Sequence, residues 1–243
     1  MDYAMISEKG ERRINEDSVA AAECGGRWLF ALADGLGGHG HGEVASSIVT
    51  DTARAVISET ESKHCHLDSL IETVFETAQQ RLFEKQRADS DTSSYKTTAV
   101  ILAADAGSVR WGHIGDSRLY YFRRNRLMTR TTDHSVPQML VNAGKLKEKD
   151  IRGHEDRNKL LRVLGTRYDS VKYVIDIPLK REQEQAFLLC SDGFWEWIDE
   201  KTMTKCLKKS LSAQQWLDMM TDEVLKNGRG NNMDNYSAVA IKF

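Results

Sequence analysis

Two long helical patterns follow one another directly in this sequence, and their position limits the folds that the chain can adopt. From Glu43 to Ile57 apolar residues recur every three or four positions, and a second such stripe extends from Asp68 to Phe83. A doubly wound fold would alternate strands with helices, whereas both of these helices lie between the first two strand-like runs. The order of the elements therefore predicts an α+β fold.

Most of the remaining apolar residues lie in short runs rich in β-forming side chains. Gly, Asp or Asn, which are typical turn residues, bound each run. The runs are Arg27–Ala33, Thr98–Ala104, Val109–Ile114, Arg118–Phe122, Val171–Ile177, Ala186–Cys190 and Tyr236–Phe243. Because the runs between Thr98 and Phe122 follow one another without a helix, we expect antiparallel strands connected by hairpins, in sheets that helices cover on the outside.

The rest of the chain adds helical patterns without dividing it into domains. Ser135–Leu164 is predicted to be helical and polar, with a charged loop around Lys145–Asp156, and a last helix is predicted over Ala213–Leu225. The sequence contains no internal repeat, low-complexity tract or linker rich in Pro, Gly and Ser. We therefore expect a single domain over residues 1–243.

The charges of the chain are nearly balanced. Against 34 Lys and Arg residues stand 36 Asp and Glu residues, so the formal net charge of the 243 residues is −2. This balance argues against a nucleic-acid binder that depends on a large basic excess. No apolar run approaches the roughly 18 residues of a membrane-spanning helix, and the first residues lack the layout of a signal peptide. We expect a cytoplasmic protein that binds neither nucleic acid nor membrane.

Aspartates at the ends of strand-like runs are the first candidates for functional residues. Asp34 follows Trp28–Ala33, Asp116 follows Val109–Ile114, Asp192 follows Phe187–Cys190, and Asp234 immediately precedes the closing strand. Any one of them has the sequence of an ordinary turn. The four together, with Asn15-Glu16-Asp17 near the start, suggest a rim of converging carboxylates whose repulsion a hard divalent cation would offset. Spacing alone leaves both interpretations open.

The glycine-rich stretch Gly35–Glu43 enters the first helix, where backbone N–H groups could cradle a phosphate. A flexible connection capped at Glu43 is the alternative, and the spacing is neither that of a P-loop nor that of a dinucleotide site. Covalent catalysis has little support, because no Gly-x-Ser-x-Gly motif is present. The widely spaced Cys24, Cys65, Cys190 and Cys206 predict reduced thiols rather than disulfides or a zinc site.

Eight short motifs follow one another along nearly the whole chain. They are Arg12-x-x-Asn15-Glu16-Asp17-Ser18, Ala33-Asp34-Gly35-x-Gly37-Gly38-His39-x-x-Gly42-Glu43-x-Ala45-Ser46, Thr97-Thr98, Gly112-His113-Ile114-Gly115-Asp116-Ser117-Arg118, Asp133-His134-Ser135, Arg157-Asn158 with Leu164-Gly165, Ser191-Asp192-Gly193 and Asp234-Asn235-x-Ser237. In this order they resemble the protein phosphatase 2C (PPM) family of metal-dependent Ser/Thr phosphatases, in its compact bacterial form. The resemblance implies an antiparallel β-sandwich flanked on both faces by pairs of helices, with a flap, residues 133–165, beside the active site.

The resemblance also implies metal ligands among the strand-end residues. Asp34 is expected to bridge two Mn²⁺ or Mg²⁺ ions, with the Gly35 carbonyl on one ion and with Asp192 and Asp234 on the other. Asp116 and Asp192 are similar to the pair that holds a third, weaker ion in bacterial members.

Further residues are expected to serve the substrate and the ligands. Arg12 is similar to the clamp on the substrate phosphate, which suits a planar guanidinium. Glu16, Asp17 and Asn235 are similar to residues that bind metal-bound waters or orient the ligands. The resemblance implies that a hydroxide bridging the two metal ions attacks phosphoserine or phosphothreonine, with no phosphoenzyme.

Three positions depart from the family's pattern. Leu36 stands where many eukaryotic members carry a His that is thought to protonate the leaving group, so a metal-bound water or His39 becomes the expected proton donor. Lys96 replaces the usual Gly before Thr97, and Glu196 replaces an Asp that serves as a further ligand of the third metal in eukaryotic members.

The expected function is hydrolysis of phosphorylated Ser and Thr in proteins, by a monomer that opposes a Ser/Thr kinase. Some compact bacterial members oppose kinases that control secretion machinery or cell-envelope growth. Two alternatives remain open: a catalytically weak relative that binds phosphoproteins, and a metal-dependent hydrolase of small phosphate esters. Two bound divalent ions would change the formal charge from −2 to +2, so we expect substrate binding to require metal.

Overall fold

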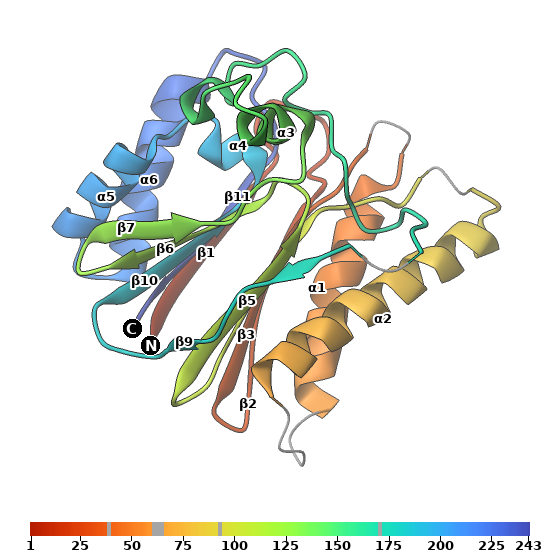
Figure 1. The fold of residues 1–243 in the computed structure, drawn as a ribbon, viewed down its shortest axis with the longest axis horizontal. Coiled ribbons are helices and arrows are strands. Elements are labelled where there is room, and N and C mark those ends of the chain that lie inside the picture. Colours follow the sequence, from red (N-terminus) through yellow and green to blue (C-terminus); the bar gives the residue numbers. More distant parts are fainter. Residues whose placement is uncertain (38–39, 60–65, 92–93, 170–171) are drawn as a thin grey trace.

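Two antiparallel sheets stacked face to face form the centre of the molecule (Figure 1). The computed structural model describes residues 1–37, 40–59, 66–91, 94–169 and 172–243. One sheet contains, in spatial order, β1 (Asp2–Glu8), β11 (Tyr236–Lys242), β10 (Gln185–Cys190), β6 (Arg118–Arg123) and β7 (Arg126–Arg130). The other contains β2 (Asp17–Cys24), β3 (Arg27–Asp34), β4 (Ala99–Ala104), β5 (Ser108–Ile114) and β8 (Val174–Ile175), and β9 (Leu179–Lys180) also pairs with β5.

Alternate side chains of the central strands bind the two sheets together. In β3, Phe30 and Leu32 belong to the core between the sheets, whereas Leu29 and Ala31 belong to the core beneath the helices. Phe187 of β10 enters the inter-sheet core from the opposite sheet. Because both faces of these strands are buried, their sequences are continuous apolar runs rather than alternating patterns.

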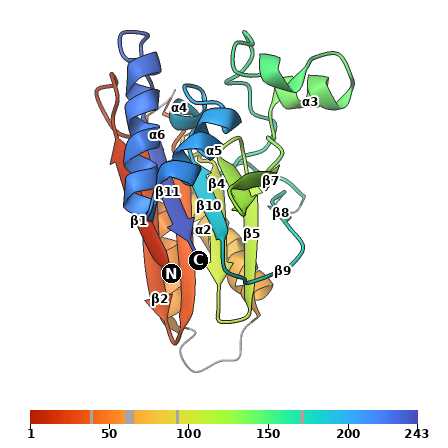
Figure 2. The ribbon, with the colours of Figure 1, turned by 90° about the vertical axis from the view of Figure 1, so that its left-hand side faces the viewer.

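Pairs of helices cover the outer faces of the sandwich (Figures 1 and 2). The helices α1 (Gly42–Glu59) and α2 (Leu67–Ala88) pack against the β2–β3–β4–β5 sheet. On the other sheet lie α5 (Glu200–Lys209) and α6 (Ala213–Gly228), and the short helix α4 (Asp192–Trp195) follows β10. The predicted α+β sandwich with helix pairs on both faces is confirmed.

The strands β5 and β6 do not form the hairpin that their adjacency predicts. They belong to different sheets, so that Gly115–Ser117 crosses from one sheet to the other. Gly115 has a φ of +101°, and a Cβ atom there would lie 2.6 Å from the Thr98 side chain. This close crossing therefore requires glycine, and it puts Asp116 at the rim of the sandwich.

The prediction of a helical Ser135–Leu164 segment is largely wrong. Only α3 (Val136–Asn142) and the single 3₁₀ turn Glu148–Asp150 are helical there. The charged residues of this segment provide no sustained apolar stripe for a helix to bury, so tertiary contacts determine its course. The sequence pattern also missed β1, β2, β7 and α5.

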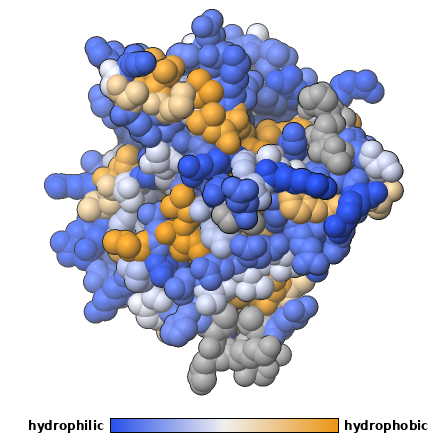
Figure 3. All heavy atoms as spheres, turned by 45° about the vertical axis from the view of Figure 1, so that its right-hand side comes forward, coloured by the Kyte–Doolittle hydropathy of each residue, from blue (hydrophilic) through white to orange (hydrophobic). Residues whose placement is uncertain are grey.

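Within the described ranges, no helix combines the length and the apolar character that crossing a bilayer requires. The surface in Figure 3 is largely hydrophilic, with hydrophobic residues in separate areas. Among the exposed large hydrophobic side chains are Met128 of β7, Ile177 and Leu211. Singly exposed apolar residues of this kind are ordinary in a folded protein and identify no site.

Candidate active site

A pocket of about 670 Å³ opens at the rim of the sandwich where the proposed ligands meet. Five separate segments supply its carboxylates, namely the loop before β2, the end of β3, the β5–β6 crossing, the start of α4 and the residues before β11. The expected site residues that line it are Arg12, Glu16, Asp34, Gly35, Asp116, Asp192, Asp234 and Asn235. The structure thus brings all of them together except Asp17, which lies behind the pocket.

The carboxylates stand close enough to perturb one another. Burial, and after it the charges of Asp17, Asp192, Asp116 and Asp234, raise the pKa of Asp34 well above its ordinary value. Burial and the charge of Asp192 likewise raise the pKa of Asp116. The pKa of Asp192 rises to about 6, mainly through burial, and its side chain shares a hydrogen bond with Asp34. The rim is therefore a concentration of carboxyl groups that disfavour one another's ionised form.

Arg12, expected to bind the substrate phosphate, and Asp234, expected to bind metal, form an ion pair with each other. The Arg12 Nε donates to Asp234 Oδ1 at 3.0 Å and its Nη2 donates to Oδ2 at 2.8 Å. The two side chains are 44% and 37% exposed, so the pair lies at the open side of the pocket. The sequence indicated both residues for the site but not their pairing.

Asn235 holds the loop that carries Arg12 and Glu16 against the pocket. Its Oδ1 accepts a hydrogen bond from the Glu16 backbone N–H at 2.8 Å, and its Nδ2 donates to the carbonyls of Lys9 and Ile14 at 2.8 and 2.9 Å. Every polar atom of the Asn235 side chain is thus committed to this loop. Asn235 therefore fixes the backbone of this loop beside the pocket.

Asp17 is buried directly behind the rim. Its Oδ2 accepts a hydrogen bond from Ser191 Oγ at 2.7 Å, while its Oδ1 has no hydrogen-bond partner within the part of the chain that the structure describes. Burial is the main reason that the pKa of Asp17 rises to about 7. A buried carboxylate oxygen without a donor fits a position beside bound cations.

Sequence reasoning assigned no role to the hydroxyl of Thr98, which connects two of the proposed ligands. The Asp34 backbone N–H donates to Thr98 Oγ1 at 3.1 Å, and Thr98 Oγ1 lies 2.7 Å from Ser117 Oγ. The end of β3 is thereby tied to the β5–β6 crossing that carries Asp116. Its place in the Thr97-Thr98 motif was the only signal for it in the sequence.

The three residues that depart from the family pattern, Leu36, Lys96 and Glu196, make specific contacts near the pocket. The Leu36 N–H donates to the Lys96 carbonyl at 2.9 Å, so the backbone of Lys96 makes a close approach despite its side chain. Glu196 pairs with Arg157 of the flap at 2.8 Å, and burial raises the pKa of Glu196 to about 7. Gly38 and His39, the second candidate for proton donor, lie outside the described residues.

The donor set fits hard divalent cations, which bind to carboxylate and carbonyl oxygens. The unpartnered Asp17 oxygen and the mutual repulsion of four rim aspartates both indicate missing positive charge. Within the described residues no three His, Cys, Asp or Glu side chains are already arranged as a metal site, and the Asp34–Asp192 hydrogen bond joins two side chains that an ion would separate. The residues are therefore chemically suited to metal and gather at one rim, but here Asp192 bonds to Asp34 and Asp234 bonds to Arg12.

The raised pKa values predict how the metal-free protein responds to pH. For Asp17 and Asp192 the folded pKa values of about 7 and about 6 exceed those of the unfolded chain, so their stabilising contribution is lost as pH rises through these values. We expect the melting temperature in chelator to fall between pH 6.5 and 8. Below pH 6.5 His134, whose pKa burial lowers to about 3, opposes the trend because only the unfolded chain takes up its proton.

The measurement is thermal unfolding in chelator and in excess Mn²⁺ at several pH values. Bound cations replace the protons, so the fall with rising pH is expected to be smaller in Mn²⁺. A melting temperature that rises with pH in chelator over this window would contradict the assignment of uncompensated carboxylates.

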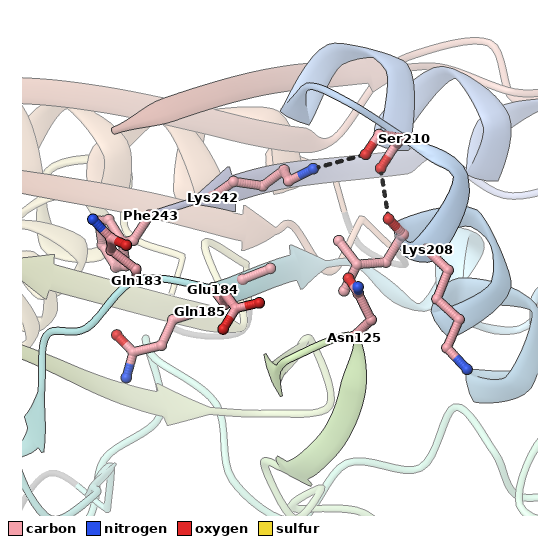
Figure 4. Close-up of a pocket in the computed structure, with 10 residues that line it drawn as sticks. Asn125, Gln183, Glu184, Gln185, Lys208, Ser210, Lys242 and Phe243 are labelled. Atoms are coloured by element: carbon pink, nitrogen blue, oxygen red, sulfur yellow. Dashed lines mark hydrogen bonds between the residues drawn. The ribbon is translucent and has the colours of Figure 1, made fainter.

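A second cavity, shown in Figure 4, lies at the opposite end of β10 and β11 from these residues. It has a volume of about 460 Å³ and lies between the start of β10 and the end of α5, where Lys242 Nζ donates to the Ser210 carbonyl at 3.1 Å. None of the site residues predicted from the sequence lines it. Its lysine, amide and backbone groups offer no converging set of ligands.

Comparison with known proteins identifies the family. The sequence model described as Protein phosphatase 2C matches residues 7–235, so the chain belongs to the protein phosphatase 2C family. The serine/threonine protein phosphatase PstP of Mycobacterium tuberculosis is 30% identical over 210 residues, which make up 85% of this chain and 38% of that protein. The chain therefore spans less than half the length of this relative.

Solved structures agree with this identification. A crystal structure of the M. tuberculosis phosphatase PstP superposes with a TM-score of 0.84 and 27% identity, and the match covers 99% of this chain and 97% of that one. The catalytic domain of PstP in complex with two manganese ions has a TM-score of 0.81 and 27% identity, with 98% and 96% covered. The resemblance drawn from the motifs is thus confirmed in sequence and in fold.

Proposed function

We propose that this chain is a Mn²⁺- or Mg²⁺-dependent phosphatase that hydrolyses phosphoserine and phosphothreonine in proteins. The observation that carries the proposal is the convergence of Asp34, Asp116, Asp192 and Asp234 on one pocket beside an arginine. Membership of the protein phosphatase 2C family supports the reaction class. The two manganese ions in the PstP structure support the choice of cofactor.

Two ions would be held by the carboxylates of Asp34, Asp192 and Asp234 with the Gly35 carbonyl, and a weaker third ion by Asp116 and Asp192. When bound, such ions supply a water-derived nucleophile at neutral pH and positive charge against the phosphoryl group. A Cβ atom on Gly35 would lie 2.1 Å from the Gly42 carbonyl oxygen, so glycine is required where these two backbone segments meet beside the ligands.

Arg12 would bind and orient the substrate phosphate. Its planar fork already holds a carboxylate through two parallel hydrogen bonds, and the same geometry matches two phosphate oxygens. Because the side chain is 44% exposed, it can exchange Asp234 for a phosphate without being drawn out of a packed core. Arg12 would thus neutralise Asp234 in the empty protein and the phosphate in the complex.

The proton for the departing alkoxide has no assigned side chain. Because the Leu36 side chain has no proton to donate, we assign this role to a water molecule. Glu196, whose pKa rises to about 7, lies in the adjoining cavity with Arg12 and Asp192, but it is paired with Arg157. The partners we propose are phosphorylated proteins, in keeping with the names of the phosphatase relatives, and the kinase that modifies those proteins.

The deciding experiment compares substrates under one set of conditions. Phosphate release from a phosphothreonine peptide, from its phosphoprotein and from a nucleotide is measured with Mn²⁺, with Mg²⁺ and with chelator. We expect turnover only with metal. We also expect kcat/KM to be about 10-fold or more higher for the phosphoprotein than for the nucleotide, because in an open site contacts with the protein surface distinguish the two substrates.

The alternatives lead to other results. Efficient nucleotide turnover with a lower kcat/KM for phosphoprotein would indicate a small-ester hydrolase. Phosphopeptide binding without turnover in Mn²⁺ would indicate a binding relative. Phosphopeptide affinity that is unchanged by chelator would contradict the expectation that substrate binding requires metal.

A further inference from the structure

Trp195 connects two of the proposed metal ligands through a single hydrogen bond. It is the last residue of α4, which begins at Asp192, and its side chain is 2% exposed. Its indole Nε1 donates to the backbone carbonyl of Asp116 at 3.0 Å. The crossing that carries Asp116 is thereby joined to the helix that carries Asp192, although the two segments lie far apart in the sequence.

A buried ion pair fixes the orientation of the Trp195 ring. The Arg118 guanidinium carbon lies 3.5 Å from the centroid of the ring. Arg118 donates from Nε and Nη2 to the two carboxylate oxygens of Asp133 at 2.9 and 2.6 Å, and its Nη1 donates to Tyr120 Oη at 3.1 Å. The side chains of Arg118 and Asp133 are only 2% and 1% exposed. A stacked cation held in this way leaves the indole little freedom to tilt.

The backbone of Trp195 is held as well. Arg152 of the flap donates from Nε to the Trp195 carbonyl at 3.0 Å and from Nη2 to Glu200 at 2.9 Å. The position of the ring and that of its backbone are therefore set by two different arginines. The indole N–H is accordingly presented to Asp116 by a rigid support.

The other hydrogen bonds of the Gly115–Ser117 crossing connect it to residues outside α4. Gly115 exchanges two hydrogen bonds with His134, since its N–H donates to Nδ1 at 3.2 Å and its carbonyl accepts from the His134 N–H at 2.9 Å. Ser117 is tied through Thr98 to the Asp34 backbone. Thr98 thus relates Asp116 to Asp34, whereas the Trp195 bond relates Asp116 to Asp192.

We propose that Trp195 is a positioning residue that sets the separation of Asp116 and Asp192, and through it the affinity for the weakest of the three cations. The part of this inference that concerns metal affinity rests on the proposed function. The donor is an N–H on a clamped ring, so its loss would let the Asp116 turn move relative to α4 while Thr98 still holds it to Asp34. Outer contacts of this kind commonly change metal affinity by about 10- to 100-fold.

The chain provides a matched control in Trp216. This tryptophan is fully buried, and its Nε1 donates to the backbone carbonyl of Met203 at 3.1 Å, between α6 and α5. Trp195→Phe and Trp216→Phe therefore each remove one buried indole-to-carbonyl hydrogen bond. Both are expected to lower stability by a similar amount, because each leaves one buried carbonyl without its donor. Only Trp195→Phe removes a contact to the site.

The first test uses metal-free protein and does not depend on the proposed function. Amide hydrogen exchange is followed by mass spectrometry in a peptide that spans residues 113–119. We expect exchange in this peptide to be about 5- to 10-fold faster in Trp195→Phe than in Trp216→Phe or the unchanged chain, corresponding to the loss of one hydrogen bond. Equal exchange in both variants would overturn the positioning role.

The second test is calorimetric titration of the full chain with Mn²⁺ alone. Trp195→Phe is expected to weaken the last binding step by about 10-fold and to leave the first two steps as they are in Trp216→Phe. Unchanged steps, or a uniform loss at all steps, would overturn the proposal.

The role of Trp195 can be tested even if the chain binds no Mn²⁺ or if Trp195→Phe does not fold. A parent chain that takes up no Mn²⁺ would refute the proposed function, while the exchange comparison would still decide whether Trp195 holds Asp116. If Trp195→Phe does not fold, the Trp195 indole is replaced by its benzothiophene isostere, which keeps the ring over which Arg118 stacks and removes only the N–H donor. The same expected and contrary results then apply.

Discussion

Asp34→Asn is expected to lower the turnover of a phosphothreonine peptide in Mn²⁺ by about 10²- to 10³-fold, the usual cost of removing one preorganised electrostatic group. Asn keeps the shape of the side chain but removes the negative charge that makes Asp34 the proposed bridge between two cations. The measurement is kcat/KM for phosphate release at saturating Mn²⁺, together with the Mn²⁺ concentration that gives half-maximal activity.

The same substitution distinguishes lost chemistry from lost folding. Burial, and after it the charges of the neighbouring aspartates, raise the pKa of Asp34, so an uncharged amide is more easily accommodated there than a carboxylate at neutral pH. Asp34→Asn is therefore expected to unfold in chelator at the same or a higher temperature than the parent chain. Asp218→Asn, on an exposed position of α6, serves as the control and is expected to keep parental activity. Parental turnover in Asp34→Asn would contradict the metal mechanism.

Asp133→Asn is expected to lower the free energy of unfolding by about 3 to 5 kcal/mol, the usual cost of removing one partner of a buried ion pair. The substitution leaves the Arg118 guanidinium buried at 2% exposure without its countercharge. It would also loosen the support of Trp195. The measurement is urea unfolding at neutral pH, with the midpoint and slope fitted separately so that a change in cooperativity is detected.

The matched control for this prediction is an exposed ion pair. Asp51 and Arg54 of α1 interact at 3.0 Å with side chains that are 68% and 50% exposed, so Asp51→Asn is expected to cost less than about 1 kcal/mol. The double substitution Arg118→Met with Asp133→Leu is expected to recover much of the lost stability, because neither charge is then left unpaired. Equal losses for Asp133→Asn and Asp51→Asn would show that the buried pair contributes no more than a surface pair.

The helices and strands that were predicted correctly are those whose own residues form a clear apolar pattern. The apolar stripes of α1, α2 and α6 and the continuous runs of β3, β4 and β10 were recognised because each buries its own apolar face. The missed strands β1 and β7 lie at the edges of their sheet and carry exposed side chains. Their pairing depends on a neighbouring strand rather than on a pattern of their own.

The same division applies to the site. The carboxylates were predictable for two reasons. An Asp at the end of a buried strand is held rigidly, and the motifs that contain these aspartates follow one another in the order of a known family. The crossing at Gly115, the Arg12–Asp234 pair and the bond from Trp195 to Asp116 were not predictable. Each joins residues from segments that meet only after the two sheets have stacked.

Sequence motifs alone were enough to predict the residues of the candidate site, namely aspartates at strand ends, an arginine and a glycine where two backbone segments approach closely. The order of the apolar patterns in the sequence also determined the α+β class. How these charges compensate one another could be seen only in the folded chain, because electrostatic energies depend on distances and burial that arise between segments far apart in the sequence. In that structure Arg12 neutralises Asp234, and the Arg118–Asp133 pair supports the tryptophan that holds Asp116 beside Asp192.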